Sequence, residues 1–392
     1  MKEGWEYKTF KDQFSINMGK TPPRGDSSSW DKSKITTNKW VSIADISLNE
    51  GKIIFDTKEY ISDKAAEKIK KVKAGSLLMS FKLTIGKMAF AGDDLFTNEA
   101  IIAIPQNEDY DLHFLYYYLL QYDWRTLTEG NEKVKGATLN KQSIGKIQLP
   151  IISMDEQRRI VSYLDSSFKL IDEIKNKALK SLTEAKALFQ SALAEAMEPK
   201  EGTLMERIGD VFTTYAGGTP LKSQKDYYEG GEIPWLRSGE VCKKYISETE
   251  LYITQKGMDN SSAKFYPENT VVVAMYGATA AQVGILKIKA TSNQAVCGII
   301  PHKDFIPEYV YYWFLFVQVD LASQAQGGAQ PNISQIKIKN VLIPIIKKEE
   351  QKQIVSHLDK LSSKVQAIEE KYQKMVEECD ALKQAMLRDV FE

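Results

Sequence analysis

Two long stretches of the 392-residue chain repeat apolar residues at alternating steps of three and four, the spacing that lines one face of a helix. This pattern predicts helices over roughly Asp155–Met197 and Glu349–Phe391. Pro150 and Pro344 precede the two stretches, and no proline interrupts either of them. The apolar positions of the second stretch are Ile354, Leu358, Leu361, Val365, Ile368, Tyr372, Met375, Cys379, Leu382 and Met386. Those of the first are Ile160, Leu164, Phe168, Ile171, Ala178, Leu182, Ala185, Phe189, Ala192 and Ala196.

The two apolar seams predict a coiled coil, with packing of each helix on its own domain as the alternative. A helix of about 40 residues is roughly 60 Å long, more than a compact domain needs. The first helix ends near Met197 and the next globular segment starts near Thr203. A link of about six residues spans at most roughly 20 Å, so it cannot return to the start of the first helix. We therefore expect antiparallel helices with one globular domain at each end, a dumbbell with a pseudo-two-fold axis.

The segments before each helix mix short apolar runs with turn-forming clusters, a pattern typical of α/β (α+β) domains. The expected strands are Leu77–Ser80, Ala100–Ile104, Thr270–Met275 and Ala295–Ile300. Aromatic runs at Phe114–Leu120 and Tyr309–Phe316 follow Asp111 and Pro307, so both are expected to be buried helices. The resulting organisation is a globular domain at 1–151, a helical region at 152–200, a second globular domain at 201–345 and a second helical region at 346–392.

The two halves carry the same motifs in the same order, at an offset of about 195 residues, which indicates two duplicated domains. The matching motifs of the globular segments are Gly19–Pro22 and Gly217–Pro220, Lys39–Ile46 and Pro234–Val241, Thr97–Ala100 and Ser292–Ala295, Phe114–Tyr118 and Tyr309–Trp313, and, more loosely, Gly136–Asn140 and Gly328–Ile333. The clearest match joins the Pro-Ile-Ile, Glu-Gln, Ile-Val-Ser and Leu-Asp motifs of 149–165 to those of 343–359.

The composition, 43% hydrophobic and 27% charged residues, is that of an ordinary globular protein. The three cysteines (Cys242, Cys297 and Cys379) and three histidines are too scattered for a disulfide framework or a metal cluster, which favours a reducing cytoplasmic location. The N-terminus lacks the apolar core of a signal peptide, and no apolar stretch would span a membrane. The 52 basic and 52 acidic residues leave no net charge, which argues mildly against nucleic-acid binding unless charge is sorted by face.

Over its whole length the chain resembles the specificity subunits of Type I restriction–modification systems. The resemblance rests on the Gly-x-Thr-Pro turns, on the strand motifs at Trp40 and Trp235, and on the Pro-Ile-Ile motifs that precede both long helices. The first domain departs from the second, with Pro23-Arg24 and a serine run after its turn and Lys82–Gly86 where the second has Tyr276–Thr279. This variation lies where bases would be read, so it leaves the target sequence open.

The resemblance implies a non-catalytic subunit that binds a bipartite sequence of double-stranded DNA, with one part for each target recognition domain. Its helices would dock two adenine-N6 methyltransferase subunits, and restriction (translocase) subunits would join through them. S-adenosylmethionine, ATP and Mg would belong to those partners, with no cofactor, metal or catalytic residue in this chain and no membrane partner. In agreement, the sequence lacks the Asn/Asp-Pro-Pro-Tyr/Phe motif of amino-methyltransferases, and Phe14 stands where a phosphate-binding loop ending at Gly19-Lys20-Thr21 would need glycine.

Candidate DNA contacts are loop residues able to reach phosphates or base edges. At the Gly-x-Thr-Pro turns they are Lys20, Arg24 and Lys222, with a purely structural turn as the alternative. For base edges they are Arg24, Lys82, Thr84, Lys133, Lys135 and Asn140 in the first domain, and Arg237, Tyr276, Thr279, Gln326, Gln330 and Asn332 in the second. For every one of them the alternative is a solvated loop residue.

Other conspicuous residues favour structural roles. Asn98 and Asn293 are expected in turns, and Trp40 and Trp235 in the core, because each tryptophan opens an apolar strand. The Lys68–Lys73 cluster favours a solvated helix face over phosphate contact. Two other functions compete with DNA specificity: a structural coiled-coil adaptor whose duplicated heads bind proteins, and an enzyme with an unrecognised site. Zero net charge favours the adaptor slightly, and the missing catalytic constellations disfavour the enzyme.

Overall fold

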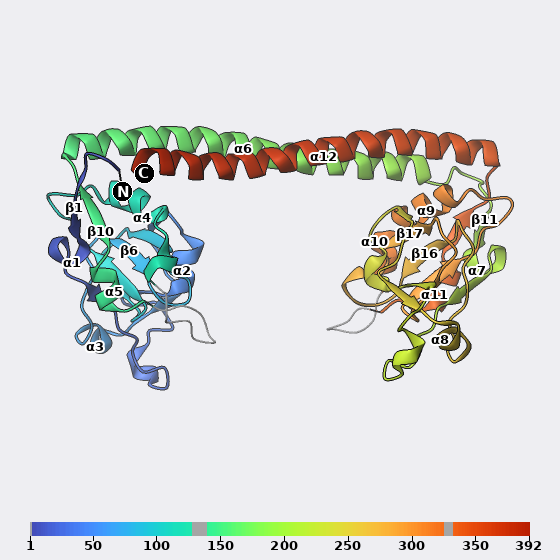
Figure 1. The fold of residues 1–392 in the computed structure, drawn as a ribbon, viewed down its shortest axis with the longest axis horizontal. Helices are drawn as coiled ribbons and strands as arrows, with labels where there is room; N and C mark the ends of the chain where they lie inside the picture. Colours follow the sequence, from blue (N-terminus) through green and yellow to red (C-terminus); the bar gives the residue numbers. More distant parts are fainter. Residues whose placement is uncertain (1, 128–138, 325–331) are drawn as a thin grey trace. The chain divides into compact units, whose positions relative to one another are not determined.

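The computed structural model describes residues 2–127, 139–324 and 332–392. The chain forms two compact units (Figure 1): Met1–Ala178 with Lys374–Glu392, and Leu179–Gln373. The part of each unit that lies outside the two long helices is called here the first head (residues 2–153) and the second head (residues 198–347). Segments of both long helices complete each unit.

The two heads share one sheet topology, which is the structural form of the sequence repeat. Each contains a five-stranded sheet. In the first head its order is β2 (Asn17–Met18), β9 (Ile101–Ile104), β6 (Leu77–Ser80), β7 (Met88–Ala91) and β4 (Ile53–Ile54). In the second it is β12 (Thr214–Ala216), β19 (Val296–Ile299), β16 (Val271–Ala274), β17 (Val283–Leu286) and β14 (Tyr245–Ile246). The four strands expected from the sequence are thus confirmed as β6, β9, β16 and β19.

Smaller sheets extend each head in the same matched way. The three-stranded sheets are β5 (Glu59–Tyr60), β3 (Lys39–Val41) and β8 (Phe96–Thr97), matched by β15 (Leu251–Ile253), β13 (Ile233–Leu236) and β18 (Thr291–Ser292). The two-stranded ribbons are β1 (Glu6–Thr9) with β10 (Gln148–Ile151), and β11 (Met205–Arg207) with β20 (Leu342–Pro344). In both ribbons, therefore, the segment that opens a head pairs with the segment that leads into a long helix.

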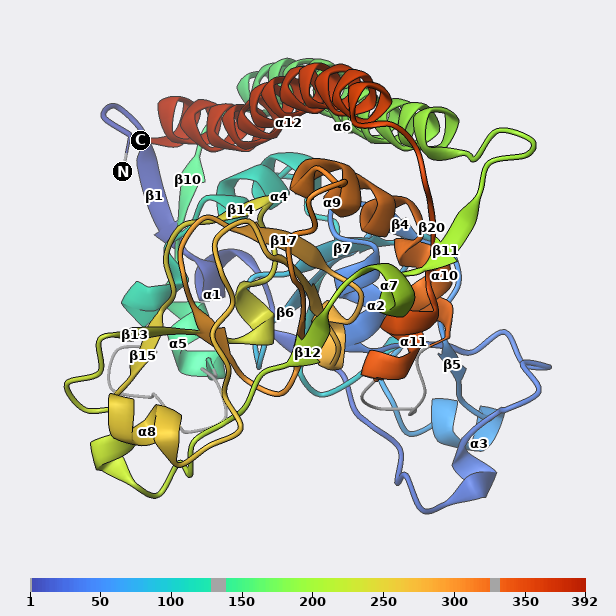
Figure 2. The same ribbon diagram turned by 90° about the vertical axis from the view of Figure 1, so that its right-hand side faces the viewer.

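Short helices pack around these sheets. The first head has α1 (Phe10–Gln13), α2 (Ile43–Leu48), α3 (Asp63–Ala66), α4 (Leu112–Leu120) and α5 (Lys141–Gly145), with 3-10 turns η1 (Ser27–Ser29) and η2 (Trp124–Leu127). The second has α7 (Ile208–Val211), α8 (Gln255–Asp259), α9 (Pro307–Phe316), α10 (Gln318–Ser323) and α11 (Gln335–Asn340), with η3 (Lys225–Tyr227), η4 (Ser238–Glu240) and η5 (Gly277–Thr279). In the second head α8 lies at the end remote from the long helices (Figures 1 and 2).

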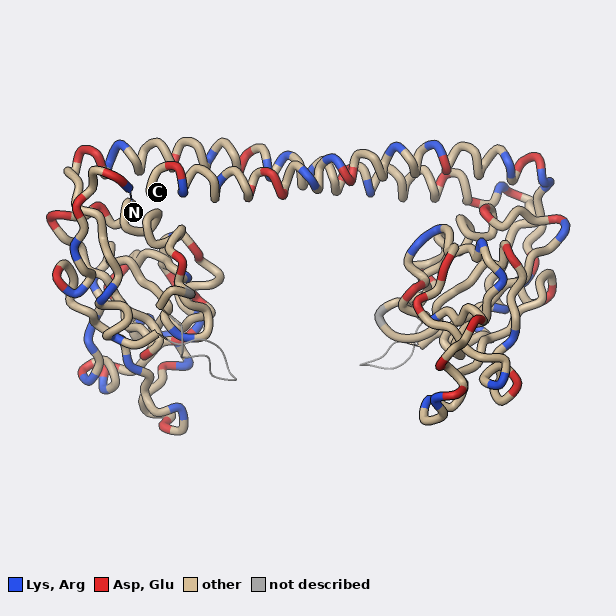
Figure 3. The backbone as a smooth tube through the Cα atoms, viewed as in Figure 1, with Lys and Arg blue, Asp and Glu red and all other residues tan. Residues whose placement is uncertain are grey.

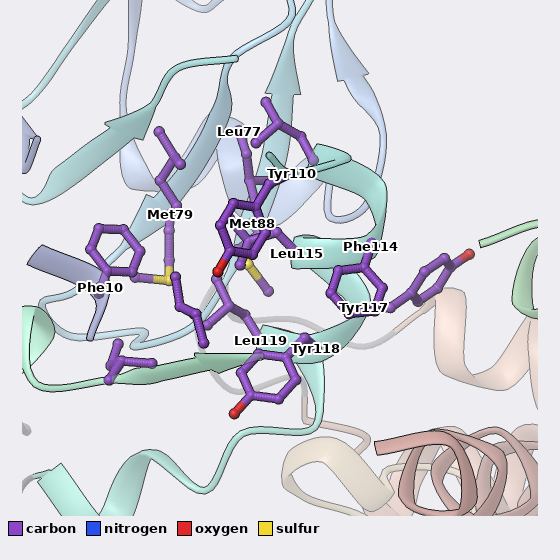
Figure 4. Packing of buried hydrophobic residues seen from close by; sticks show 14 of the residues in the cluster. Phe10, Leu77, Met79, Met88, Tyr110, Phe114, Leu115, Tyr117, Tyr118 and Leu119 are labelled. Carbon is purple, nitrogen blue, oxygen red and sulfur yellow. The ribbon is translucent and has the colours of Figure 1, made fainter. Parts of the chain in front are cut away.

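Both faces of the central sheet are covered, which explains why its strands are continuous apolar runs rather than alternating ones. In β6, Leu77 and Met79 face a core formed with α1 and α4, while Leu78 faces a second core formed with α2. Figure 4 shows residues of the first of these cores, which come from α1, the sheet and α4 and include Phe10, Met79, Met88 and Phe114. The aromatic helices expected from the sequence are confirmed as α4 and α9.

The long helices are α6 (Met154–Met197) and α12 (Lys348–Phe391), each within one residue of its expected start. Within the first unit they run antiparallel, because Asp172 pairs with Lys383 and Lys175 with Asp380 at 2.6 Å. Within the second unit, the end of α6 packs against the beginning of α12. Antiparallel pairing is therefore confirmed inside each unit.

The buried face at the C-terminal end of α12 differs from the predicted apolar seam. Leu382 is 50% exposed, whereas Leu387, Val390 and Phe391 are buried in the core of the first head. Near its end, α12 packs on a globular domain as well as on α6, so the face that it buries shifts away from the regular heptad positions.

The Lys68–Lys73 cluster was expected on a helix, and this is wrong. Helix α3 ends at Ala66, and Val72 forms an isolated β-bridge with Leu95. Burial of Ile69 and Val72 in two different cores draws this segment out of helical geometry. Lys70 instead donates to Asn17 of β2, and Lys73 to Asp94.

Candidate nucleic-acid interface

The Gly-x-Thr-Pro turns pack directly on the turns that follow β8 and β18. The backbone amide of Lys20 donates to the carbonyl of Thr97 at 2.8 Å, and that of Gly218 donates to Ser292 at 2.9 Å. A Cβ atom on Gly19 would lie 2.0 Å from the Thr97 carbonyl oxygen, and one on Gly217 would lie 2.2 Å from that of Ser292. Glycine is therefore required at both positions by contact with backbone.

The two tryptophans and two asparagines support these turns. The Nε1 of Trp40 donates to the Lys20 carbonyl at 3.2 Å, and that of Trp235 donates to the Gly218 carbonyl at 2.9 Å. Both indoles are buried, which confirms their expected place in the core. The Oδ1 atoms of Asn98 and Asn293 accept from backbone amides two residues later, so their expected structural role in turns is confirmed.

A second pair of equivalent residues bridges the two turns at the surface. The Thr21 hydroxyl donates to the Glu99 carboxylate, and Thr219 makes the matching contact to the Gln294 side chain. Burial raises the pKa of Glu99, but the Thr21 hydroxyl, the backbone amide of Glu99 and the charges of Lys82 and Arg24 outweigh it, so the pKa lies below its usual range. Glu99 is therefore ionised at neutral pH, and it lies among candidate cations.

In the first head, Arg24 is fixed by a carboxylate and by two aromatic rings. Its guanidinium binds both carboxylate oxygens of Glu59, with the Nη2–Oε2 distance at 3.1 Å. The Cζ atom lies 4.2 Å from the ring centroid of Trp30 and 4.9 Å from that of Trp40. Arg24, Trp30 and Glu59 line an open hollow of about 560 Å³, called here the Arg24 hollow. Its other lining residues are Gly25, Ser27, Asp31, Lys32, Lys34, Lys58 and Tyr60.

In the second head, the counterpart of Arg24 is Lys222, two residues after the proline of the turn. Lys222 and Arg237 line a hollow of about 400 Å³ together with Gln294. The Arg237 side chain is paired with Glu240 and Glu250. The structure thus brings the candidates Lys222 and Arg237 together around the turn, and in the first head the charges of Lys82 and Arg24 both lower the pKa of Glu99.

The remaining described candidates lie on the loops next to these turns. Lys82 and Thr84 follow β6, and Tyr276 and Thr279 follow β16 at the equivalent place. Thr84 and Tyr276 are exposed, and the Thr279 hydroxyl donates to the Tyr276 carbonyl at 3.3 Å. These side chains border the turns without filling a closed site.

Two asparagine candidates have different surroundings. Asn140 caps α5 by accepting from the Ser143 amide at 2.8 Å, and Ser334 caps α11 in the same way. Ser334 is therefore the counterpart of Asn140, and the loose sequence match to Asn332 is off by two residues. Asn332 instead pairs with Tyr276 in an isolated β-bridge. Lys133, Lys135, Gln326 and Gln330 lie outside the described residues.

Sequence reasoning missed Glu59, Trp30, Glu99 and Gln294. A signal for the last two was present, because the Thr97–Ala100 and Ser292–Ala295 motifs repeat with Glu in one half and Gln in the other. Glu59 carries no such signal, since only the pairing of β3 with β5 brings it beside the turn.

Charge is mixed along both heads, and Lys and Arg alternate with Asp and Glu along the backbone (Figure 3). Among the described residues, many Lys and Arg side chains pair with nearby carboxylates. The equal numbers of basic and acidic residues are therefore mixed over the described surface rather than separated into charged patches. Across the described ranges, no three His, Cys, Asp or Glu residues gather where a metal ion could be held. A helix long and apolar enough to cross a membrane is also absent from that part of the chain.

Comparison with known proteins identifies the class. The model of the family described as the Type I restriction modification DNA specificity domain matches residues 2–184 and again residues 201–378. Because the two matches cover most of the chain, it belongs to this family, and the resemblance noted from its motifs is confirmed. The two matched ranges coincide with the two copies of the structural repeat.

Individual relatives carry the same description. The Type I restriction enzyme EcoR124I/EcoR124II specificity subunit of Escherichia coli is 27% identical over 270 residues, which are 66% of this chain and 65% of that protein. The MjaIX specificity subunit of Methanocaldococcus jannaschii is 31% identical over 159 residues, 39% of this chain and 36% of its own length. The match therefore spans just under two thirds of the first relative and about a third of the second.

Solved structures show the same fold at low identity. A chain from work on complex assembly and conformational transition of the type I R-M system aligns with a TM-score of 0.80 at 17% identity, covering 100% of this chain and 98% of that one. The HsdS subunit from Thermoanaerobacter tengcongensis aligns with a TM-score of 0.56 at 17% identity, covering 100% and 97%.

Proposed function

We propose that this chain is the non-catalytic DNA-reading subunit of a Type I restriction–modification complex, and that each head binds one part of a bipartite duplex target. The observation that carries the proposal is the repeated surface in the two heads. Each presents a Gly-x-Thr-Pro turn bridged to a second turn through Thr21–Glu99 or Thr219–Gln294, with exposed cations beside it. Membership of a DNA specificity family supports nucleic acid as the ligand.

The two parts of the target are expected to differ in sequence. The repeat preserves the backbone of the surface but changes the side chains that it displays: Arg24 is replaced by Lys222, Lys82 by Tyr276 and Glu99 by Gln294. These changes alter hydrogen-bond donors and acceptors, which are what distinguish base edges in the major groove. Because the two heads display different side chains on the same backbone, the two parts of the target should differ in sequence.

The long helices are proposed to dock two adenine-N6 methyltransferase subunits and, through them, restriction subunits. Helix α6 leaves large apolar side chains exposed, including Tyr163 (51%), Leu170 (59%) and Leu188 (60%). Such residues on a helix that is otherwise strongly polar are suited to a protein partner. S-adenosylmethionine, ATP and Mg would be bound by those partners, which would carry out methylation and cleavage.

The test is to co-express the chain with a candidate methyltransferase subunit and to map N6-methyladenine in the host DNA. We expect methylation at one two-part, asymmetric motif. A complex that forms but leaves the DNA unmethylated, and shows no preference among duplexes, would contradict the proposal. That result would favour the protein-binding adaptor instead.

A further inference from the structure

The Arg24–Glu59 pair leaves one edge of the guanidinium free. Glu59 binds the two terminal nitrogens, Nη1 and Nη2, so the carboxylate lies at the end of the group. A guanidinium has five N–H donors, and this pairing uses two of them. Among the described residues, none accepts a hydrogen bond from Nε of Arg24. The Nε–H and the adjacent Nη–H therefore remain as two parallel donors.

A second bidentate pair in the same chain shows the contrast. Arg159 on α6 binds Glu156 through Nε at 2.8 Å and Nη2 at 2.7 Å, so the carboxylate occupies the edge that Arg24 leaves open. Both arginines are exposed and carry a carboxylate partner. Only Arg24 retains the paired donors that match the O6 and N7 acceptors of a guanine edge.

The aromatic residues near Arg24 hold its side chain in place. Trp30 lies against the guanidinium, and its own Nε1 donates to the Pro23 carbonyl at 3.1 Å. Trp30 and Trp40 meet edge to face, with ring centroids 5.1 Å apart. Stacking and the two bonds to Glu59 remove rotamer freedom before any ligand arrives, which lowers the entropic cost of binding.

The surroundings of Arg24 fit a duplex. Lys32 and Lys58 are exposed and line the Arg24 hollow, where their charges can meet phosphates on either side of a base edge. Glu59 neutralises much of the Arg24 charge, so this arginine contributes less to non-specific attraction than an unpaired one would. The arrangement therefore favours discrimination between bases over general affinity.

Among its described residues, the second head has no counterpart of the Arg24–Glu59 pair; its Arg237 instead binds Glu240 through Nε and Glu250 through Nη2. In the β-sheet register Glu59 lies opposite Trp40, whereas Leu251 lies opposite Trp235. The counterpart of Arg24 is Lys222, which has no planar fork of donors. Within the part of the chain that the structure describes, the free donor edge found at Arg24 is thus a feature of the first head.

We infer that Arg24 reads one guanine in the half-site of the first head, through its Nε edge in the major groove, with Glu59 and Trp30 as positioning residues. The inference rests on the proposed function, since it specifies how that surface selects a base. It assigns a role to Glu59 that no motif in the sequence indicated.

The test uses the full chain in complex with its methyltransferase partner and a library of duplexes randomised in both half-sites. We expect Arg24→Gln to change the preference at a single position from guanine towards adenine, which a glutamine can bind through N6 and N7, by about tenfold or more. The rest of that half-site and the other half-site should keep their preferences. Arg159→Gln, which removes a bidentate arginine on α6 and outside the head, should leave the base preference at every position unchanged, whatever its effect on partner docking.

Glu59→Gln tests positioning separately. It should weaken discrimination at the same guanine position while leaving thermal unfolding nearly unchanged, because exposed ion pairs add little stability. A structural role alone would not change the preference at one base position. Equal loss of affinity for all duplexes in Arg24→Gln, with the wild-type complex still sequence-specific, would overturn this inference and leave the proposed function standing. A wild-type complex without any base preference would overturn both.

Discussion

The hydroxyl of Tyr117 donates a 2.6 Å hydrogen bond to Asp165, joining α4 of the first head to α6. Tyr312 makes the equivalent contact to Asp359 on α12, where Lys244 also reaches the carboxylate. Burial and the nearby carboxylate hold the pKa of Tyr117 above its usual range, so the hydroxyl remains a donor at neutral pH. The same bond thus fixes each head to the helix that follows it.

Replacing Tyr117 with Phe should lower the free energy of unfolding by about 1 kcal/mol, because one hydrogen bond to a partly solvated carboxylate is lost while the ring stays buried. Urea denaturation would measure the change. Tyr163→Phe is the matched control, since that residue is half exposed on α6, and it should change stability by less than about 0.5 kcal/mol. Equal effects from the two variants would show that the bond to Asp165 contributes nothing.

Gln157→Ala should be more damaging, by about 3 kcal/mol. Gln157 is fully buried; its Nε2 donates to the carbonyls of Asp109 and Ile152, and its Oε1 accepts from the Asp111 amide. Truncation removes these three hydrogen bonds to backbone groups and leaves a cavity where the buried side chain lay. Gln190→Ala, at an exposed position on the same helix, is the control.

The matching variant in the second head is Gln351→Ala. Gln351 repeats the same three bonds, so it should lose a similar amount of stability in denaturant unfolding. A loss below about 1 kcal/mol for both variants would contradict the account of their backbone partners.

Phe391→Ala should destabilise the first unit by about 3–5 kcal/mol, the usual cost of removing a buried aromatic side chain. Phe391 is 1% exposed and packs against Trp5, Phe114 and Tyr118, although nearly 400 positions separate the two ends of the chain. Hydrogen exchange should show loss of protection in the first head. Leu382→Ala, 50% exposed on the same helix, should leave that protection intact.

Gly19→Ala and Gly25→Ala test whether glycine is needed at a position because the backbone packs closely there. A Cβ at Gly19 would lie 2.0 Å from a backbone oxygen, whereas one at Gly25 would meet nothing within 4 Å. We expect Gly19→Ala to lower the melting temperature and abolish duplex binding by the first head, and Gly25→Ala to leave the melting temperature unchanged. Normal folding of Gly19→Ala would contradict the close packing of the two turns.

Alkylation should distinguish the cysteines. Burial raises the pKa of the Cys297 thiol to about 12, so at pH 8 it stays protonated, whereas Cys242 is exposed. Iodoacetamide should modify Cys242 in the native protein and Cys297 only after denaturation, as peptide mass spectrometry would show. Because the folded pKa of Cys297 is the higher one, its contribution to stability is complete below pH 9 and is lost as pH rises towards 12. Native-state labelling of Cys297 as fast as that of Cys242 would refute this.

The sequence alone determined the duplication, the strands β6, β9, β16 and β19, the two long helices and their antiparallel direction. Those features depend on local periodicity, on the order of motifs and on the reach of a short linker, all of which are readable along one chain. Trp40 and Trp235 were also placed correctly, because the indole of a tryptophan at the start of an apolar strand is usually buried in the core.

Only the tertiary structure decided which residues share a surface. Glu59 meets Arg24 through the pairing of β3 with β5, and Phe391 enters a core built mainly from the first 165 residues. The end of the second seam and the Lys68–Lys73 segment departed from prediction for the same reason. In the Lys68–Lys73 segment these contacts outweigh local helical preference, and at the end of α12 they change which face of the helix is buried, because burial of apolar side chains contributes more free energy than propensity does.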